Sequence, residues 1–352
     1  MSLRVGLVGF GLAGRVLHAP LIRAAGMEIV GVVTRQAEAV AASLPAASTY
    51  VDAESLLAVA KPDLVVIASP NHLHHPQALL SLAAGAHVVV DKPMALTLAE
   101  AHTMMQAATN AGRVLSVFHN RRWDSDFLTV QRLVAERALG AIHHYEARWE
   151  RFSPTVRERW REQAEAGGGL LNDLGPHLID QALCLFGQPD WLQAEVYTQR
   201  PGAVVDDAFE IRMGYGQLRV VLGANCLAAS PAPRFRLLSA TASFTKHGLD
   251  VQEAQLKDGM RPDSPGFGVE PESQWGLLTD GASAAVRAVP AERGHWLHYY
   301  RSLLRSITDG TPPPVAASAA PAVLSIIEAA RSSSASGCRI KLLNSQPSAA
   351  PE

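Results

Sequence analysis

The chain has 352 residues, which is enough for about two domains. Lysine and arginine number 31 and aspartate and glutamate 33, so the formal net charge is −2. This near-balance argues against binding of a polyanion such as a nucleic acid through overall charge, although a local basic patch stays open. Hydrophobic residues make up 48% and charged residues 18%, which excludes disorder, collagen and coiled coil for the whole chain.

Cysteine usage and hydropathy favour a cytoplasmic chain without a membrane partner. The three cysteines are far apart and form no C-x-x-C, which argues against a disulfide framework or a cysteine-built zinc site: Cys184, Cys226 and Cys338. The apolar stretch 78–90 contains Gly85 and His87 and is too short to span a bilayer. Arg4 followed by VGLVGFGLAG superficially resembles a signal peptide, but crowded glycines and no clear cleavage site argue against export.

The first 120 residues alternate short β-rich runs with alanine-rich stretches of helical length. Uninterrupted apolar runs such as LVVIA and HVVV suit strands buried on both faces, so we predict a doubly wound parallel sheet of the Rossmann type. In such a sheet, ligands bind beyond the carboxyl ends of the strands. Strands are predicted at 4–8, 29–33, 64–68, 87–90 and 114–118, and helices at 13–25, 53–60, 75–84 and 98–111.

The pattern changes after about residue 120, where a helix is predicted from Phe127, Val130 and Leu133 at helical spacing. Longer alternating segments without regular helices between them then predict an antiparallel sheet: 142–152, 192–198, 208–215, 217–226, 235–238 and 242–246. Further helices are predicted at 173–186, 296–308 and 320–331, with a loop at 259–271 and a frayed tail from Asn344. We therefore expect two domains, 1–120 and 121–352.

A glycine motif opens the first strand–helix unit. G-x-G-x-x-G needs glycine for a tight turn, for close approach of the backbone to a pyrophosphate, and for close packing of helix on strand. The helix N-terminus then offers N–H groups and partial positive charge to the phosphates. A glycine turn in any α/β protein is the alternative, but the flanking strand and helix favour dinucleotide binding by Gly9, Phe10, Gly11, Leu12, Ala13 and Gly14.

The end of the second predicted strand distinguishes NAD from NADP. A carboxylate there would bind the ribose 2′-OH, but this chain has Thr34 and Arg35. Arg35 can pair with a 2′-phosphate, which favours NADP, with NAD as the alternative. The alternative role for Arg35 is a solvated residue or a platform for adenine.

Several later segments carry a family resemblance. The run ASPNHLHHPQALLSLAAGAHVVVDKPMALT and the later GGGLLNDLGPHLID resemble the T-P-N-x-x-H, A-G-K-H-V-x-x-E-K-P and G-G-G-x-x-x-D-x-G-x-H-x-x-D patterns of the Gfo/Idh/MocA oxidoreductases. The segments FHNRRWDSDF, GHWLHYYRSL and TPPPV look like the subgroup that includes bacterial scyllo-inositol dehydrogenases. The departures are small: Ser69 stands for Thr, Ala86 for Lys and Asp91 for Glu.

The resemblance covers essentially the whole chain. It implies an N-terminal NAD(P)-binding domain and a C-terminal α/β domain for substrate and oligomerisation, with a mostly antiparallel open sheet. It implies hydride transfer between nicotinamide and a carbinol or ketone carbon of a polyol, inositol or sugar-like substrate, in a homodimer or homotetramer. Two other functions stay open: a non-catalytic NAD(P)-sensing regulator on the same fold, and an NAD-cycling glycoside hydrolase or lyase.

Proton transfer at the substrate oxygen calls for a group that exchanges protons near neutral pH. His177 lies on a predicted helix one turn after Asp173, so the carboxylate can orient the imidazole, and the glycines at 167–169 allow a close approach just before the helix. Lys92 follows a predicted strand at its carboxyl end, where its ammonium can stabilise alkoxide charge. The alternatives are a capping Asp, a satisfied His and an exposed Lys. The family resemblance implies that Lys92, Asp173 and His177 act together.

The remaining candidate residues are weaker. The resemblance places a further set near the cofactor, with a turn or an amphipathic helix as alternatives: Ser69, Asn71, His74, Asp91, Lys92, Trp160 and Arg161. Arg122, Trp123 and Tyr299 are candidates for the substrate pocket, with core packing as the alternative for the aromatic residues. The HLHH run lacks a spaced set of metal ligands, so no metal site is expected.

Overall fold

The computed structural model describes residues 2–342, which form two compact units. The first unit contains the chain up to Asn120 together with Gln252–Phe267 and His295–Pro321. The second contains Arg121–Val251, Gly268–Gly294 and the chain from Ala322 onward. The first continuous segment of the first unit ends at Asn120, where a domain boundary was expected, and two later segments that were not expected there belong to the same unit.

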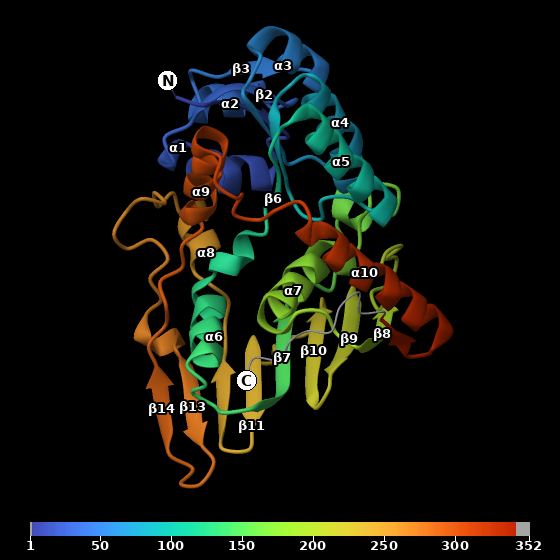
Figure 1. Cartoon of the computed structure of the whole chain (residues 1–352), viewed down its shortest axis with the longest axis vertical. Coiled ribbons are helices and arrows are strands. Elements are labelled where there is room, and N and C mark those ends of the chain that lie inside the picture. Colours follow the sequence, from blue (N-terminus) through green and yellow to red (C-terminus); the bar gives the residue numbers. More distant parts are fainter. Residues whose placement is uncertain (1, 343–352) are drawn as a thin grey trace. The chain divides into compact units, whose positions relative to one another are not determined.

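A six-stranded parallel sheet forms the centre of the first unit, in the order β3-β2-β1-β4-β5-β6 (Figure 1). Its strands are β1 (Arg4–Val8), β2 (Glu28–Val33), β3 (Ser48–Tyr50), β4 (Leu64–Ile67), β5 (His87–Val90) and β6 (Leu115–Val117). The apolar run of β4 is buried at every position, as expected for a strand covered on both faces. The order reverses between β1 and β4, so the strand ends that flank this switch point include the glycine motif.

The helices of the first unit follow the pattern of a doubly wound fold. After β1 comes a π-helical segment, Ala13–His18, which continues as α1 (Ala19–Ala24). The others are α2 (Ala37–Ser43), α3 (Ala53–Ala60), α4 (His74–Ala83), α5 (Leu98–Ala111), α8 (Gln252–Lys257) and α9 (Leu297–Asp309). Thr97 and Glu100 form a capping box at the start of α5, and Gly112 ends it in a left-handed conformation.

The second unit is built on a nine-stranded sheet in the order β14-β13-β12-β11-β7-β10-β9-β8-β15. Every neighbouring pair is antiparallel except β7 and β10, which confirms the mostly antiparallel sheet that the family resemblance implies. The strands are β7 (Ile142–Glu150), β8 (Trp191–Tyr197), β9 (Ala208–Tyr215), β10 (Leu218–Asn225), β11 (Phe235–Ser239), β12 (Ala242–Lys246), β13 (Gly276–Asp280), β14 (Val286–Val289) and β15 (Ile340–Lys341).

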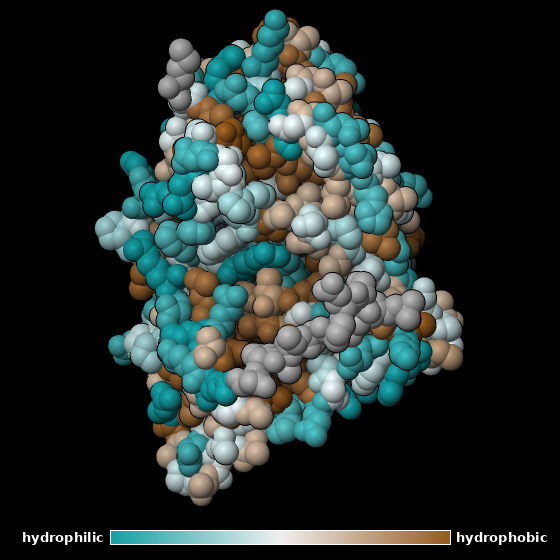
Figure 2. All heavy atoms as spheres, in the orientation of Figure 1, coloured by the Kyte–Doolittle hydropathy of each residue, from teal (hydrophilic) through white to brown (hydrophobic). Residues whose placement is uncertain are grey.

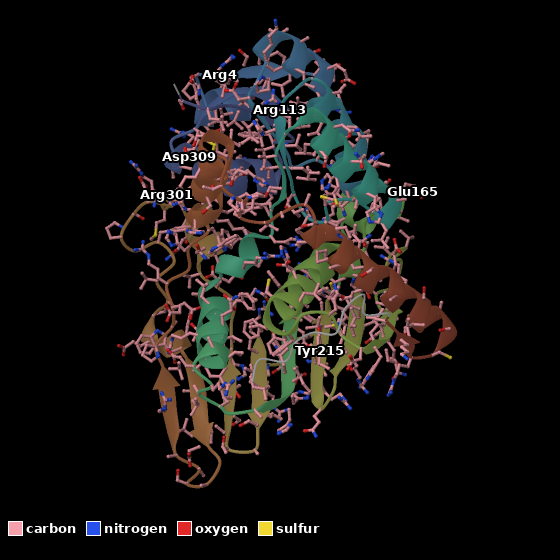
Figure 3. The ribbon with its side chains drawn as sticks, in the orientation of Figure 1. Arg4, Arg113, Glu165, Tyr215, Arg301 and Asp309 are labelled. Carbon is pink, nitrogen blue, oxygen red and sulfur yellow. The ribbon has the colours of Figure 1, made fainter. Side chains whose placement is uncertain are left out.

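Three helices accompany this sheet: α6 (Ser125–Ala135), α7 (Leu170–Phe186) and α10 (Ala319–Ser336). Helix α7 packs against β7, β9 and β10, and its residues Leu171, Leu178 and Ile179 join a core with the inward-facing side chains of those strands (Figure 1). Tyr215, labelled in Figure 3, is the last residue of β9. The predicted tail from Asn344 lies outside the described residues.

On the face shown in Figure 2, hydrophilic and hydrophobic residues alternate over short distances. Exposed large apolar side chains occur in both units, for example Val51 and Val286. Among the helices that the structure describes, none has the length and apolar character needed to cross a membrane.

Candidate active site

The glycine motif forms a turn that only glycine can make. Gly9 has a φ of 97°, and a Cβ there would lie 2.5 Å from the carbonyl oxygen of Ala68. A Cβ on Gly14 would overlap the carbonyl oxygen of Gly9, so helix and strand pack as closely as the sequence predicts. A Cβ on Gly11 would meet no atom within 4 Å, so this position faces open space.

This turn fits a dinucleotide. The N–H of Gly9 donates to Val33 on β2 (3.0 Å), and the N–H of Arg15 donates to Gly11 (2.9 Å), which fixes the turn against the sheet and starts the helix. The first N–H groups of a helix have no acceptor within the helix and attract an anion. The open space beside Gly11 at this helix start is where a pyrophosphate would be held by backbone N–H groups.

Thr34 and Arg35 follow β2, as predicted. The hydroxyl of Thr34 accepts a hydrogen bond from the backbone N–H of Gln36 (3.0 Å), and the N–H of Thr34 donates to Tyr50 on β3 (3.1 Å). Arg35 is exposed at this strand end. Its guanidinium is therefore accessible to a ligand, and no acidic residue directly follows β2.

The segment after β4 is ordered by its own polar groups. Asn71 is buried and begins a short 3-10 turn, Asn71–Leu73, before α4. His74 is 1% exposed, and its Nδ1 and Nε2 lie 2.8 Å from the carbonyl oxygen of Pro93 and 3.0 Å from that of Ser69. Burial lowers the pKa of His74. Through these two carbonyl oxygens, its ring connects the segment after β4 with the segment after β5.

Asp91 and Lys92 lie where the chain leaves β5. The N–H of Asp91 donates to Ile67 (2.8 Å), and its Oδ1 accepts from the N–H of Lys92 (2.8 Å). The Lys92–Pro93 peptide bond is cis. Burial by itself raises the pKa of Asp91, but the contact with His18 and the charge of Lys92 outweigh burial and hold the pKa well below its usual range.

In the second unit, the glycine run before α7 packs against the protein's own backbone. A Cβ on Gly168 would lie 2.5 Å from the carbonyl oxygens of Arg161 and Gln163, and Gly169 has a φ of 102°. The close approach expected of this run is thus to the 3-10 turn Trp160–Glu162. Asp206 caps α7, because its carboxylate accepts from the N–H of Leu171 (2.6 Å).

Asp173 lies in the first turn of α7, where its N–H donates to Gly169 (3.0 Å). Its carboxylate lies 3.3 Å from Nε of Arg161, and the Arg161 guanidinium lies over the ring of Trp160 (4.5 Å). The structure therefore joins three of the candidate residues in one cluster at the start of α7. The helix that was an alternative for Trp160 and Arg161 is reduced to a single 3-10 turn.

His177 lies one turn further along α7 and is 6% exposed. Its ring stacks on Trp149 of β7, with centroids 5.9 Å apart and an interplanar angle of 26°. Two guanidinium groups lie over the same indole, those of Arg121 at 4.7 Å and Arg234 at 5.5 Å. Sequence reasoning did not find the Trp149 stack on His177 or the two guanidinium groups over this indole, because such tertiary contacts leave no mark in local spacing.

The weaker substrate candidates have well-defined partners. Arg122 makes a bidentate pair with Asp180 on α7, through Nε (2.8 Å) and Nη2 (2.6 Å). Trp123 ends the 3-10 turn Asn120–Trp123. Tyr299 is fully buried in α9, and its hydroxyl lies 2.7 Å from Oγ of Ser116, a contact of the kind expected for core packing.

The HLHH run serves hydrogen bonding in the described structure. His75 Nε2 lies 2.8 Å from the hydroxyl of Thr103, and the partners of His74 are backbone carbonyls. Within residues 2–342, no group of three or more His, Cys, Asp or Glu side chains is arranged to hold a metal ion.

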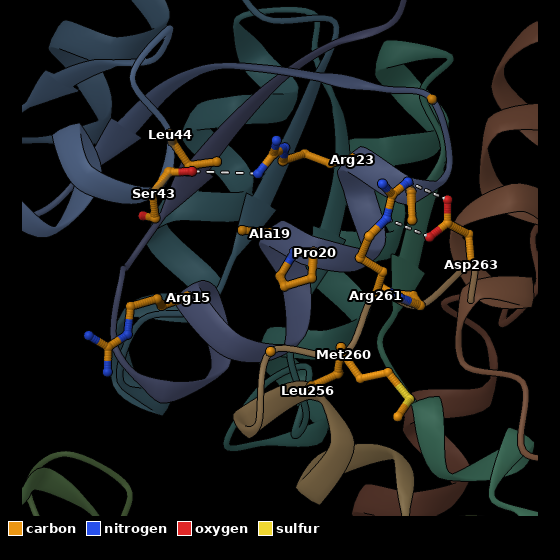
Figure 4. Close-up of a pocket in the computed structure, with 14 residues that line it drawn as sticks. Arg15, Ala19, Pro20, Arg23, Ser43, Leu44, Leu256, Met260, Arg261 and Asp263 are labelled. Carbon is orange, nitrogen blue, oxygen red and sulfur yellow. Dashed lines mark hydrogen bonds and ion pairs between the residues drawn. The ribbon is translucent and has the colours of Figure 1, made fainter. Parts of the chain in front are cut away.

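A pocket of about 590 Å³ lies beside α1, and Arg15, the residue directly after the glycine motif, is part of its lining (Figure 4). Arg15, Arg23 and Arg261 line it, and Arg261 pairs with Asp263 (2.7 Å). None of the candidate cofactor or substrate residues contributes to its lining.

The fold and the glycine turn define an NAD-binding Rossmann oxidoreductase, and comparison with known families agrees. Residues 3–119 match the family model described as "Oxidoreductase family, NAD-binding Rossmann fold", and residues 127–245 match the "GFO/IDH/MocA C-terminal domain". The chain belongs to the Gfo/Idh/MocA family, as the sequence motifs implied.

Individual relatives match between about half and nearly all of the chain. The scyllo-inositol 2-dehydrogenase (NADP(+)) IolW of Bacillus subtilis is 37% identical over 336 residues, which is 95% of this chain and 94% of the relative. The D-glucoside 3-dehydrogenase of Escherichia coli is 32% identical over 53% of this chain and 55% of the relative. The solved structure of YvaA from Bacillus subtilis has a TM-score of 0.93 and 36% identity, and it covers 97% of this chain and 99% of that chain.

Proposed function

We propose that this oxidoreductase is an NADP-dependent dehydrogenase that acts on a secondary alcohol, or the matching ketone, of a polyol, inositol or sugar-like substrate. The observation that carries the proposal is the 37% identity to a scyllo-inositol 2-dehydrogenase over 95% of the chain, together with a proton-transfer candidate in each unit. The partial match to a D-glucoside 3-dehydrogenase supports the same substrate class.

NADP is the proposed coenzyme. Arg35 is exposed directly after β2, and Thr34 beside it turns its hydroxyl to the backbone of Gln36. A guanidinium pairs in bidentate fashion with a phosphate, and a carboxylate that would repel one is missing at this strand end. The IolW relative is named as NADP-dependent, which supports the same choice.

Three residues are proposed to carry the proton chemistry. The bound nicotinamide would accept or supply the hydride. Lys92 would donate a hydrogen bond to the substrate oxygen and stabilise developing alkoxide charge. His177 would exchange the hydroxyl proton, with Asp173 on the same helix to orient it. Trp149 fixes the plane of the His177 ring by stacking, which suits an imidazole that must hold one orientation.

The other coenzyme contacts are proposed by position. Ser69, Asn71 and His74 follow β4, and Asp91 follows β5, so all four lie at carboxyl ends of parallel strands. We further propose a homodimer or homotetramer in the cytoplasm, because the family resemblance implies an oligomer and the three described cysteines are free thiols.

The test is nicotinamide absorbance with purified protein, NADP or NAD, and a panel of inositols, sugars, polyols and small ketones. The proposal expects turnover with at least one cyclic polyol or its ketone and a higher kcat/KM with NADP. Lys92→Ala and His177→Ala should each reduce kcat by orders of magnitude while NADPH binding, followed by its fluorescence, survives. Coenzyme binding without turnover on the whole panel would indicate the sensing regulator, and release of sugar without net NADPH would indicate the cycling hydrolase.

A further inference from the structure

A fully buried histidine lies on the helix that starts at the glycine turn. His18 ends the π-helical segment, is 0% exposed, and packs its ring against Phe118 with centroids 4.3 Å apart. Its Nδ1 lies 2.6 Å from the hydroxyl of Tyr300 on α9, and its Nε2 lies 3.8 Å from Oδ2 of Asp91 after β5. One imidazole therefore contacts polar groups from two other parts of the first unit.

The hydrogen positions in this chain of contacts follow from the chemistry of the groups. With the Tyr300 hydroxyl as donor to Nδ1, the ring hydrogen of His18 lies on Nε2, which faces Asp91. The 3.8 Å between Nε2 and Oδ2 of Asp91 is an ion-pair distance and longer than a hydrogen bond. Burial raises the pKa of Tyr300 well above its ordinary value, so its hydroxyl keeps its proton. The pKa of Asp91 lies well below its usual range, although burial opposes this, in agreement with a carboxylate that stays charged beside His18.

Asp91 contacts both His18 and the backbone of Lys92. Its Oδ2 faces His18, while its Oδ1 accepts from the backbone N–H of Lys92 (2.8 Å). The following residue, Pro93, is held from the opposite side by His74, whose Nδ1 lies 2.8 Å from the Pro93 oxygen. Both chain neighbours of Lys92 therefore contact a buried histidine: Asp91 contacts His18, and Pro93 contacts His74.

The far end of the network is anchored as well. Arg301 and Asp309 mark α9 in Figure 3, and Tyr300 lies in its first turn. The neighbouring Tyr299 holds α9 to β6, because its hydroxyl lies 2.7 Å from Oγ of Ser116, which also donates to Val315 (2.7 Å). Tyr300 therefore presents its hydroxyl to His18 from a fixed support.

We propose that Tyr300, His18 and Asp91 are positioning residues for Lys92, and that His18 ties the Lys92 turn to the helix of the glycine motif. The inference rests on the proposed role of Lys92 at the substrate oxygen. His18 would act through Asp91, so loss of its Nε2 contact with that carboxylate should loosen Lys92 without removing the backbone cradle for the coenzyme.

Two amide substitutions separate this role from simple packing. The side-chain nitrogen of glutamine reaches about as far as Nε2 of histidine, whereas the amide of asparagine reaches about as far as Nδ1. His18→Gln therefore keeps a donor for Asp91, and His18→Asn keeps a partner only for Tyr300. Both remove the ring from Phe118, so each serves as the packing control for the other.

The first measurement is steady-state kinetics. His18→Asn should reduce kcat by about tenfold or more, because the carboxylate of Asp91 loses the polar group that faces it. His18→Gln should stay within about threefold of the wild-type kcat, and both variants should bind NADPH with a Kd within about threefold of wild type. Equal loss of kcat in the two variants, or no loss in either, would overturn the proposal.

The second measurement does not depend on turnover. The chain has only five lysines, so acetylation by acetic anhydride can be followed at Lys92 by peptide mass spectrometry, with exposed Lys61 of the same unit as internal reference. The ratio of Lys92 to Lys61 acetylation should rise at least about threefold in His18→Asn and stay near wild type in His18→Gln. Ser81→Ala, which removes another buried hydroxyl of this unit on α4, is the matched control and should leave the ratio unchanged.

The two measurements keep the proposals apart. A wild-type protein without turnover would refute the proposed function, while a changed acetylation ratio in His18→Asn alone would still support the positioning of Lys92. Normal turnover with no difference between His18→Asn and His18→Gln in either measurement would refute the positioning role and leave the proposed function intact.

Discussion

A buried ion-pair network near the start of α7 allows a stability prediction with a magnitude. Arg200 is 2% exposed and donates through Nε to Asp207 (2.8 Å), which is 1% exposed, and through Nη2 to Glu162 (2.8 Å). Arg159 adds a second cation at 3.0 Å from Glu162, so the four charges balance. Replacement of Arg200 by methionine removes one cation and leaves Asp207 buried without its charged partner.

The expected cost is set by the groups left behind. Removing one partner of a buried pair costs about 3–5 kcal/mol. Asp207 keeps hydrogen bonds from the N–H groups of Gln199 (2.8 Å) and residue 200 (3.0 Å), so we expect the lower end, about 3 kcal/mol, for Arg200→Met. The matched control is Arg212→Met, since Arg212 is 65% exposed in its pair with Glu210 (2.9 Å) and such pairs contribute about 0–1 kcal/mol.

Urea unfolding followed by tryptophan fluorescence provides the assay. Trp296 lies in the first unit and the other five tryptophans lie in the second, so the signal is dominated by the unit that holds both arginines. With an m-value of about 2 kcal/mol/M, Arg200→Met should lower the midpoint by about 1.5 M, and Arg212→Met by less than about 0.5 M. Equal midpoints for the two variants would refute the reasoning that burial increases the contribution of this network to the free energy of unfolding.

Further predictions concern the coenzyme, the imidazole and acid stability. Gly9→Ala should raise the Kd for NADPH by more than tenfold, because its Cβ would lie 2.5 Å from a carbonyl oxygen and its φ of 97° disfavours a side chain; fluorescence titration measures this. Arg35→Ala should lower kcat/KM for NADP by about 10–100-fold and leave that for NAD within about threefold, and an equal effect on both coenzymes would contradict the 2′-phosphate assignment. Trp149→Leu should reduce kcat by about tenfold while Trp149→Phe retains most activity, since only an aromatic ring can stack on His177; similar kinetics for both would exclude the stacking role. Burial alone would raise the pKa of Asp207, but hydrogen bonds from Arg200 outweigh burial and lower this pKa. The ionised carboxylate therefore stabilises the fold above about pH 4, and this stabilisation is lost as the pH falls further. Urea midpoints measured across pH 3–6 should decline less steeply for Asp207→Asn than for wild type.

Elements that bury an apolar stripe were predictable from the sequence. The run LVVI is buried at all four positions of β4, and α3 and α5 have the bounds that their alanine-rich patterns predicted. Helix α2 and strand β3 were not predicted, because they bury too few residues to produce an apolar pattern in the sequence. Helix α2 buries only Val40, and β3 has no buried residue. Strand β14, with three of its four residues exposed, was missed for the same reason.

Site residues could be predicted where their position depends on neighbours in the sequence, and could not be predicted where it depends on tertiary contacts. The glycine turn and the lysine at the end of β5 follow from the local order of strand, turn and helix in the sequence. The stack of Trp149 on His177 could not be predicted in this way, because it joins β7 to α7. His18 did leave a signal, since Gly14, His18 and Ile22 are buried on one face of the same helical segment. A histidine in that register occupies a core position and needs polar partners there.

The interrupted path of the chain has a consequence for synthesis on the ribosome. The polypeptide passes between the two units five times, and the first unit is complete only when Pro321 has emerged. A fragment cut at Asn120 therefore lacks α9, and with it the hydroxyl that Tyr300 supplies to His18. The nucleotide-binding unit therefore reaches its full set of elements only after most of the chain has been made, and a transplant of this unit into another protein must carry both late segments with it.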